Sequence, residues 1–250
     1  MKTKNIPTVE ILDCPVHSLT MQQTLNIIKD AIEQKTQMHH VVVNAAKLVH
    51  MRKDEELRSS VLACDIINAD GQSVVWAAKI LGEHLPERVS GIDLMNNLVE
   101  CAYQKSYKIF FLGAKEEVVK KVTEVYIQKY NPDIIAGYRN GYFNPDEAAD
   151  IASQIAASKA DILFVAITSP KKEIFLNKYK GIINTPFIMG VGGSFDVVAG
   201  YVKRAPLWMQ KRGLEWLFRV IQEPRRMWKR YLVTNTLFIT AVIKAKLKRK

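Results

Sequence analysis

The sequence predicts an α/β protein in which a Rossmann-like, mostly parallel sheet is flanked by helices and followed by a basic helical C-terminal appendage. Through residue 200, short apolar runs alternate with amphipathic stretches, which is the pattern of βα units. Beyond residue 200, 14 Lys and Arg stand against two acidic residues, whereas residues 1–200 carry 22 basic and 23 acidic residues. The formal net charge of +11 is therefore a property of the C-terminal segment.

The apolar runs and the amphipathic stretches between them define the predicted elements in order. Six runs are expected to form strands: His40 to Val43, Asp65 to Ile67, Lys108 to Leu112, Asp133 to Ala136, Asp161 to Ile167 and Phe187 to Val191. The intervening stretches place apolar residues near the helical spacing and are expected to form helices: Thr20 to Gln34, Gln72 to Leu81, Leu94 to Gln104, Glu116 to Tyr130 and Glu147 to Ala157.

This pattern divides the chain into an α/β domain over residues 1–200 and an appendage over residues 201–250. The appendage also holds three of the four Trp, namely Trp208, Trp216 and Trp228. Interleaved arginines and tryptophans exceed what solubility requires, although a solvated basic face over ordinary core residues is the simpler alternative. We expect the appendage to meet something anionic, either phosphates or the headgroups of a membrane surface.

The N-terminus and the cysteines indicate a cytoplasmic protein. No apolar run follows the first lysines, so no signal peptide is expected, and no run reaches the roughly 18 residues of a spanning helix. Cys14, Cys64 and Cys101 are odd in number and scattered, which favours reduced thiols over disulfides or a zinc cluster. His39 and His40 would point to opposite faces of a strand, so they are not expected to chelate one metal ion.

Small, amide-bearing and acidic residues follow the predicted strands, where ligands bind in such sheets. They are Asn44, Asn68-Ala69-Asp70-Gly71, Gly113-Ala114, Gly137-Tyr138-Arg139-Asn140-Gly141-Tyr142, Thr168-Ser169-Pro170-Lys171 and Gly192-Gly193-Ser194-Phe195-Asp196. Neither glycine segment completes a dinucleotide motif, and no Walker lysine motif occurs, so no nucleotide cofactor is expected. Gly113, Gly192 and Gly193 are either turn glycines or sites whose backbone N–H groups donate to a phosphate or a sugar hydroxyl.

Several of these residues have a structural alternative to a catalytic role. Asp70 precedes a helix and alone is more often an N-cap than a general base. For Asp93 the cap is the preferred interpretation, and Asp196 either binds a ribose hydroxyl or closes a turn. In the appendage, Arg212, Arg219 and Arg226 are seven residues apart, as on one side of a helix that Pro224 interrupts.

Taken together, the motifs resemble the WecG/TagA/CpsF family of bacterial glycosyltransferases over roughly residues 41–228. The resemblance rests on the order and spacing of Asn68-Ala69-Asp70-Gly71, Arg88-Val89-Ser90-Gly91-Ile92-Asp93, Phe111-Leu112-Gly113-Ala114, Gly137-Tyr138, Ser169-Pro170-Lys171-Lys172-Glu173, Gly192-Gly193-Ser194-Phe195-Asp196, Lys203-Arg204-Ala205-Pro206, Glu215-Trp216 and Gln222-Glu223-Pro224-Arg225-Arg226. It implies inverting, metal-independent transfer of a sugar from a UDP-sugar to a polyprenyl-diphosphate-linked sugar, at the cytoplasmic membrane face.

The resemblance also assigns roles to individual residues. It implies that Asp70 is the general base that takes the proton of the acceptor hydroxyl. The remaining roles are contacts to the sugar or diphosphate from Asn44 and Arg88, nucleoside contacts from Tyr138 and Asp196, and phosphate contacts from Arg219, Arg226 and, in place of another arginine, Lys229. Guanidinium groups can neutralise the charge on the departing UDP in place of a metal ion.

Two departures from the family pattern bear on the identity of the donor. Val42 stands where many members carry Thr, and Lys172 stands where they carry Gln. The donor is therefore left open between UDP-N-acetylmannosamine and a related or uronic sugar. One hypothesis is that Lys172 meets a carboxylate or a further phosphate on the donor.

Two other functions remain as alternatives. A nucleic-acid-binding protein would use the basic appendage as its footprint, but the chain has no helix-turn-helix or RNA-binding aromatic signature, so no nucleic-acid partner is expected. The second alternative is a non-catalytic membrane module that binds a nucleotide sugar as a signal. Such a module would bind UDP without turnover, whereas an enzyme would lose its turnover and keep UDP binding when Asp70 is replaced by Ala. The oligomeric state is open, a homo-oligomer included.

Overall fold

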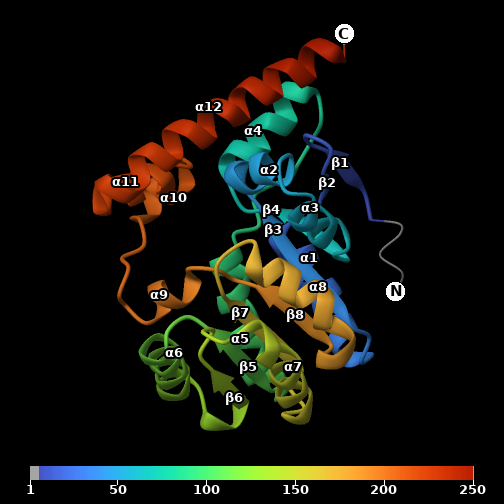
Figure 1. Ribbon diagram of the computed structural model, residues 1–250, viewed down its shortest axis with the longest axis vertical. Coiled ribbons are helices and arrows are strands. Elements are labelled where there is room, and N and C mark those ends of the chain that lie inside the picture. Colours follow the sequence, from blue (N-terminus) through green and yellow to red (C-terminus); the bar gives the residue numbers. More distant parts are fainter. Residues whose placement is uncertain (1–5, 250) are drawn as a thin grey trace.

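The protein is described by a computed structural model over residues 6–249, without the side chains of Arg226 and Arg230. Its centre is a six-stranded, fully parallel sheet in the order β4-β3-β8-β7-β5-β6 (Figure 1). The strands are β3 (Met38–Val43), β4 (Ile66–Ala69), β5 (Ile109–Gly113), β6 (Ile135–Arg139), β7 (Ile162–Ala166) and β8 (Phe187–Gly190). All six predicted strands are confirmed, with ends shifted by at most three residues, and so is the predicted α/β class.

The central strands are apolar along their whole length because both faces of the sheet are covered. Every residue of β5, β7 and β8 is buried. Parallel sheets with helices on both faces produce such continuous apolar runs, and this is why periodicity located these strands. The edge strand β6 is only partly buried, which fits its position at the end of the sheet.

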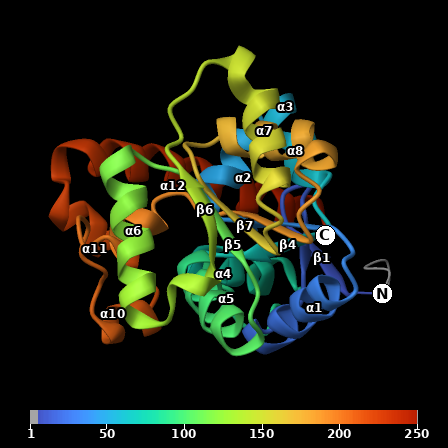
Figure 2. The same cartoon turned by 90° about the horizontal axis from the view of Figure 1, so that it is seen from below.

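The helices pack in two layers, which Figure 2 shows above and below the strands. They are α1 (Met21–Glu33), α2 (Ala45–Met51), α3 (Glu55–Leu62), α4 (Gln72–Leu81), α5 (Gly91–Lys105), α6 (Glu116–Lys129), α7 (Ala148–Ala157), α8 (Lys171–Ile183) and α9 (Ser194–Val198). Side chains of one parity on the strands, such as Phe111 and Phe164, pack with α1, α5 and α6. Those of the other parity, such as Phe110 and Leu163, pack with α7 and α8.

Several elements were not predicted from the sequence. They are an antiparallel hairpin of β1 (Thr8–Glu10) and β2 (Pro15–His17), and the helices α2, α3, α8 and α9. The hairpin strands, α2 and α9 are too short to show a clear period. In α8 the buried face includes the charged residues Lys172 and Glu173, so its pattern does not read as an apolar stripe.

The C-terminal segment forms three helices that pack on the α/β domain. They are α10 (Leu207–Lys211), α11 (Glu215–Gln222) and α12 (Pro224–Lys248), and α12 lies along α2 and α4 (Figure 1). Phe238 and Val242 of α12 are buried in the same cluster as Val41 and Val43 of β3. The basic segment is therefore folded onto the core instead of standing apart from it.

The prediction that Arg212, Arg219 and Arg226 share one helix side is wrong, because the three residues belong to three successive helices. Arg212 is the C-cap of α10, whereas Arg219 lies in α11 and Arg226 in α12. The predicted break at Pro224 is present, since this residue begins α12. A proline is tolerated at this position because the first turn of a helix has no partner for its N–H.

Candidate active site

Asp70 and Asn44 lie side by side at the carboxyl edge of the sheet. Val43 at the end of β3 pairs with Ala69 at the end of β4. Asn44 is the residue after Val43, and Asp70 is the residue after Ala69. A Cβ built on Gly71 would lie 3.5 Å from the Cβ of Asn44, which confirms how closely the two strand ends approach. The Asn44 side chain accepts the Lys47 N–H at 3.0 Å and so caps α2.

The Asp70 carboxylate is held at one oxygen and unoccupied at the other. Its Oδ1 accepts the Gly91 N–H at 3.0 Å, at the first residue of α5. Among the side chains that the structure describes, Oδ2 has no hydrogen-bond partner. Asp70 does not cap α4, whose N-cap is Gly71, so the capping interpretation is wrong for that helix. A partly buried carboxylate with one fixed oxygen can accept a proton at the other.

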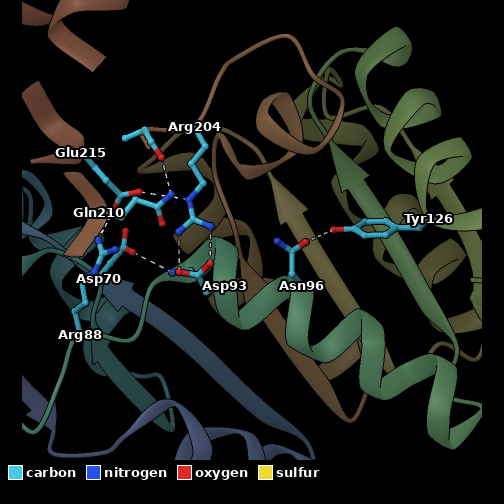
Figure 3. A network of polar contacts seen from close by, with 10 residues as sticks. Asp70, Arg88, Asp93, Asn96, Tyr126, Arg204, Gln210 and Glu215 are labelled. Atoms are coloured by element: carbon cyan, nitrogen blue, oxygen red, sulfur yellow. Dashed lines mark hydrogen bonds and ion pairs between the residues drawn. The ribbon is translucent and has the colours of Figure 1, made fainter. Parts of the chain in front are cut away.

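Beside Asp70, four charged side chains alternate in sign and join the α/β domain to the appendage (Figure 3). Arg88 contacts Glu215 of α11, and Arg204 binds Glu215 at 3.4 Å. Arg204 also makes two hydrogen bonds to the Asp93 carboxylate, at 2.6 and 2.7 Å. The appendage is thus brought to the loop that precedes α5, and with it to Asp70.

Asp93 differs from its predicted role as a helix cap. The N-cap of α5 is Ser90, and Asp93 lies in the first turn, where it binds Arg204. Burial opposes the ionisation of this carboxyl, but the hydrogen bonds from Arg204 outweigh it and hold the pKa of Asp93 below its usual range. Asp93 therefore remains an anion that anchors the appendage.

Comparison with known proteins agrees with these motifs. Residues 9–250 match the profile of the glycosyl transferase WecG/TagA/CpsF family. The chain belongs to this family. It is 32% identical over 244 residues to a Bacillus spizizenii protein named N-acetylglucosaminyldiphosphoundecaprenol N-acetyl-beta-D-mannosaminyltransferase, a match that covers 98% of this chain and 92% of that relative. A Bacillus subtilis (strain 168) protein of the same name is 34% identical over 221 residues, covering 88% and 85%.

The glycine pair of this glycosyltransferase leaves open space at the end of β8. Gly192 has a φ of +54°, and a Cβ built on it meets no described atom within 4 Å. A Cβ on Gly193 would come to 3.8 Å from Asp196 Oδ2. The backbone here is accessible to a ligand, and the Asp196 carboxylate lies next to it.

Gly113 lies in a different environment. A Cβ built on it would come to 2.7 Å from the backbone of Ala166, and its φ is +114°. The Gly141 N–H also bonds to the Ala114 carbonyl, at 2.9 Å, which closes the loop over Gly113. Tight packing accounts for this glycine, and its predicted role as a phosphate contact stays a prediction.

Tyr138 is not brought to Asp70. It lies on β6, at the opposite edge of the sheet from β4, with four strands between them. At about 4.8 Å per strand, this separates the two strands by roughly 24 Å. The accessible glycine pair after β8 lies between them in the strand order.

Lys172 belongs to a buried charge cluster and not to an open surface. Its ammonium lies 2.7 Å from Glu173 Oε1, and the Lys47 ammonium lies 2.8 Å from the same oxygen. Burial lowers the pKa of Lys172 to about 8. For Glu173, burial acts in the opposite sense, but the two lysines hold the pKa at about 2. The cluster lies where α2 and α8 begin, directly after Asn44.

The predicted cations of the appendage lie on two helices, Arg219 on α11 and both Arg226 and Lys229 on α12. Arg219 of α11 lines a cavity of about 20 Å³ together with Ile92, Val197 and Arg204, so it lies near α5 and α9. Lys229 is exposed on α12. The side chain of Arg226 lies outside the described residues, so its predicted contact stays a prediction.

The two histidines of β3 are buried and neutral. Burial lowers the pKa of His39 to about 3 and that of His40 to about 4, and the His40 ring bonds to Asn68 at 2.8 Å. Within the part of the chain that the structure describes, no three His, Cys, Asp or Glu side chains gather as metal ligands would.

Sequence reasoning missed the roles of Arg204 and Glu215. Both residues belong to the motifs that resemble the family, but no binding partner was predicted for either of them. The available signal was the rarity of acids in the basic segment, where Glu215 and Glu223 are the two. An isolated carboxylate among arginines is expected to pair with one of them.

Proposed function

We propose that this chain is an inverting, metal-independent glycosyltransferase that moves N-acetylmannosamine, or a related or uronic sugar, from its UDP conjugate to an undecaprenyl-diphosphate-linked N-acetylglucosamine or similar lipid-linked sugar. The observation that carries this proposal is the free Oδ2 of Asp70, which lies beside Asn44 and Arg88 at the carboxyl edge of the sheet. The two Bacillus relatives named as mannosaminyltransferases support the choice of sugars.

In this reaction, Asp70 acts as the general base. Its Oδ2 takes the proton of the acceptor hydroxyl while that oxygen attacks the anomeric carbon of the donor. The bond from the anomeric carbon to the UDP oxygen breaks as the new bond forms, with inversion at that carbon. The Gly91 N–H keeps the carboxylate oriented through Oδ1, so no reorganisation is needed when the proton moves.

The donor is expected to extend from Asp70 along the carboxyl edge of the sheet, past the end of β8 and toward β6. Asn44 and Arg88 contact the sugar or the diphosphate, and the backbone of Gly192 and Gly193 approaches the diphosphate or ribose. Asp196 and Tyr138 contact the nucleoside. Arg219 and Arg226, with Lys229, stabilise the negative charge that gathers on the leaving UDP.

The acceptor is lipid-linked, so the enzyme is expected to work as a peripheral protein on the inner face of the cell membrane. Among the residues that the structure describes, no helix is long and apolar enough to cross a bilayer. The basic C-terminal segment, with its exposed tryptophans, supports attraction to an anionic surface.

The decisive experiment replaces Asp70 with Asn, which keeps an oxygen for the Gly91 N–H but cannot act as a base. The turnover number is expected to fall about 10²- to 10⁴-fold while UDP binding is retained. Turnover is measured as the mass of the lipid-linked disaccharide formed from UDP-N-acetylmannosamine. Asp150→Asn, an exposed change on α7, is the control, and equal turnover in both variants contradicts the proposed role.

The role of Lys172 in donor choice is tested by Lys172→Gln, which restores the amide that many family members carry. The ratio of kcat/KM for a uronic UDP-sugar over the neutral one is expected to fall about tenfold, because a carboxylate loses its cation. An unchanged ratio removes Lys172 from donor selection and leaves it a role in the buried cluster.

A further inference from the structure

A groove with no assigned ligand opens between the α/β domain and the appendage. Its volume is about 390 Å³, within the range of roughly 300–1,000 Å³ that is usual for small-molecule sites. The residues that carry the argument are Gln72 and Val75 of α4, Pro86 and Arg88 of the following loop, and Leu207 and Lys211 of α10. The groove therefore forms where the appendage faces α4 and the loop that follows it.

One end of the groove meets the candidate catalytic carboxylate. Gln72 is two residues after Asp70, and Arg88 is one of the four charged residues beside it. Gln210, which also lines the groove, lies in the same group of side chains in Figure 3. A ligand whose reacting hydroxyl reaches Asp70 can therefore continue into this groove without crossing the sheet.

The chemistry of the walls is divided between cations and apolar side chains. Arg88 and Lys211 supply positive charge, and Val75, Pro86 and Leu207 supply apolar surface. An arginine carries five N–H donors on three nitrogens. The Arg88 bond to Glu215 uses one of these nitrogens, Nη1. The one lining carboxylate, Glu87, accepts the Met21 N–H at the start of α1 and is thereby partly compensated.

The apolar surface continues beyond the groove. Leu207 is 71% exposed, and Trp76 and Ile80 on α4 are about half exposed. The turn at Gly213 brings the two helices together, because a Cβ built there would lie 3.5 Å from the Trp76 ring. A ligand leaving the groove thus meets further apolar side chains and not a charged rim.

We propose that this groove binds the acceptor through its diphosphate and the first units of its isoprenoid chain. The diphosphate lies between Arg88 and Lys211, and the chain runs along Val75, Pro86 and Leu207 toward the lipid phase. An anionic group followed directly by an apolar chain is the chemistry that this order of residues fits. The inference rests on the proposed function, because it takes Asp70 as the point where the acceptor hydroxyl reacts.

Arg88 lies where the two sites meet, and apart from this residue the donor does not compete for this space. The accessible backbone of Gly192 and Gly193 lies after β8, on the far side of β3 from β4, whereas the groove begins after β4. The two substrates therefore approach Asp70 from opposite directions. This is the arrangement that a direct displacement with inversion requires.

A binding experiment in the absence of vesicles tests the groove directly. Farnesyl diphosphate serves as the probe and inorganic diphosphate as its chain-free counterpart, both titrated into the full-length protein. The farnesyl compound is expected to bind at least tenfold more tightly, and Leu207→Ser is expected to reduce that ratio about five- to tenfold. Lys211→Gln weakens both probes by a similar factor, since it removes a contact to the shared diphosphate.

The matched controls are a similarly exposed leucine and an exposed lysine at the other end of the appendage. Leu247→Ser on α12 is expected to leave the affinity ratio as it is in the unaltered protein, and Lys244→Gln is expected to leave the affinity for both probes unchanged. Equal affinity for the two probes overturns the proposal. So does displacement of farnesyl diphosphate by UDP in a competitive manner, or a ratio that responds to Leu247→Ser and not to Leu207→Ser.

The outcome is separable from that of the proposed function. If the chain transfers no sugar but the farnesyl preference depends on Leu207, the groove stands and the glycosyl transfer fails. If sugar is transferred but the preference is absent, the groove alone fails. Asp70→Asn is expected to abolish turnover and retain the affinity for farnesyl diphosphate, which assigns the two effects to different residues.

Discussion

Glu173 shows how a buried charge in this protein is held by its neighbours. Its carboxylate is 3% exposed and lies between the ammonium groups of Lys47 and Lys172. Charges are stable in such an interior only when they are paired, and here two cations share one anion. The three residues connect the first turns of α2 and α8, so they also fix the strand ends from which Asn44 projects.

The cluster predicts unequal costs for its members. Glu173→Gln leaves two buried cations without an anion, and we expect it to lower the free energy of unfolding by about 3–5 kcal/mol. Lys172→Gln leaves the Lys47–Glu173 pair intact and is expected to cost clearly less. Urea denaturation at pH 7 measures both values, and equal costs would show that the carboxylate is not what holds the cluster together.

The same residue sets part of the acid stability. The pKa of Glu173 is about 2 in the folded protein and 4.5 ordinarily, so its contribution is present above pH 4.5 and is lost as the pH falls toward 2. Lys172 has the opposite sense, because its folded pKa of about 8 lies below the ordinary 10.5. The cost of burying its charged form is therefore lost, and the free energy of unfolding rises, as the pH increases from 8 to 10.5. In Glu173→Gln, the free energy of unfolding should therefore decrease less steeply as the pH falls from 4.5 to 2.

At the scale of elements, the position of the appendage depends on a few contacts to α4 and α5. Gly213 has a φ of +71°, and a Cβ there would come to 2.7 Å from the side chain of Gln72, so only glycine allows the turn between α10 and α11 to approach α4. Arg204 and Glu215 then connect this turn to Asp93 and Arg88. These contacts bring the cations of the appendage to the candidate site.

The Asp93–Arg204 pair is predicted to hold α10 and α11 in place. A double-mutant cycle with Asp93→Asn and Arg204→Gln should give a coupling energy of about 1 kcal/mol, since the two-bond geometry is good but the pair is partly exposed. Hydrogen exchange over residues 206–222 should accelerate in Arg204→Gln. The exposed Glu55–Arg58 pair is the control, with a coupling near zero. If exchange in the appendage does not change, other contacts position it.

At the scale of the whole molecule, α12 is a helix with two apolar sides. One side, with Phe238 and Val242, is buried against the α/β domain. Another carries Trp228, Leu232, Ile239, Ile243 and Leu247, which are spaced as neighbours on one helix side and are all more than half exposed. With lysines flanking this stripe, α12 has the pattern of a helix that lies on an anionic membrane surface.

The exposed stripe predicts how the protein binds vesicles. Replacing Ile239 and Ile243 together with Ser should weaken sedimentation with phosphatidylglycerol vesicles at least tenfold, because two apolar side chains no longer enter the lipid. Raising the salt from 0.1 to 0.5 M should weaken it further by screening the exposed lysines. Vesicle binding that is unchanged by both the serine substitutions and the added salt would refute the membrane role.

The controls for this experiment follow from the fold. Ile182→Ser on α8 removes an exposed isoleucine from outside the stripe and should leave vesicle binding unaltered. Deletion of the residues after Gln222 is not a suitable variant, because it removes Phe238 and Val242 from the core and exposes the residues that they cover. Point substitutions on the exposed side separate membrane contact from folding.

Much of this architecture follows from local sequence pattern. The strands were recognised because strands covered on both faces are apolar throughout, and Asp70, Asn44 and the glycine pair were found because parallel strands deliver their carboxyl ends to one edge. The helix α8 and the hairpin were not predicted. Buried charges interrupt the apolar periodicity of α8, and the hairpin strands are too short to show a periodicity. The same reasoning could not say that Asp70 bonds to Gly91, which is 21 residues away.

The sequence by itself determined the six-stranded α/β domain, the basic character of the last 50 residues and the membership in a glycosyltransferase family, because composition, period and motif order are local properties. Only the tertiary structure decided that α12 belongs to the core, that Arg88 and Arg204 share Glu215, and that Lys172 is buried beside Glu173. Such pairings join residues far apart in the chain, and they depend on packing and desolvation that no local pattern records.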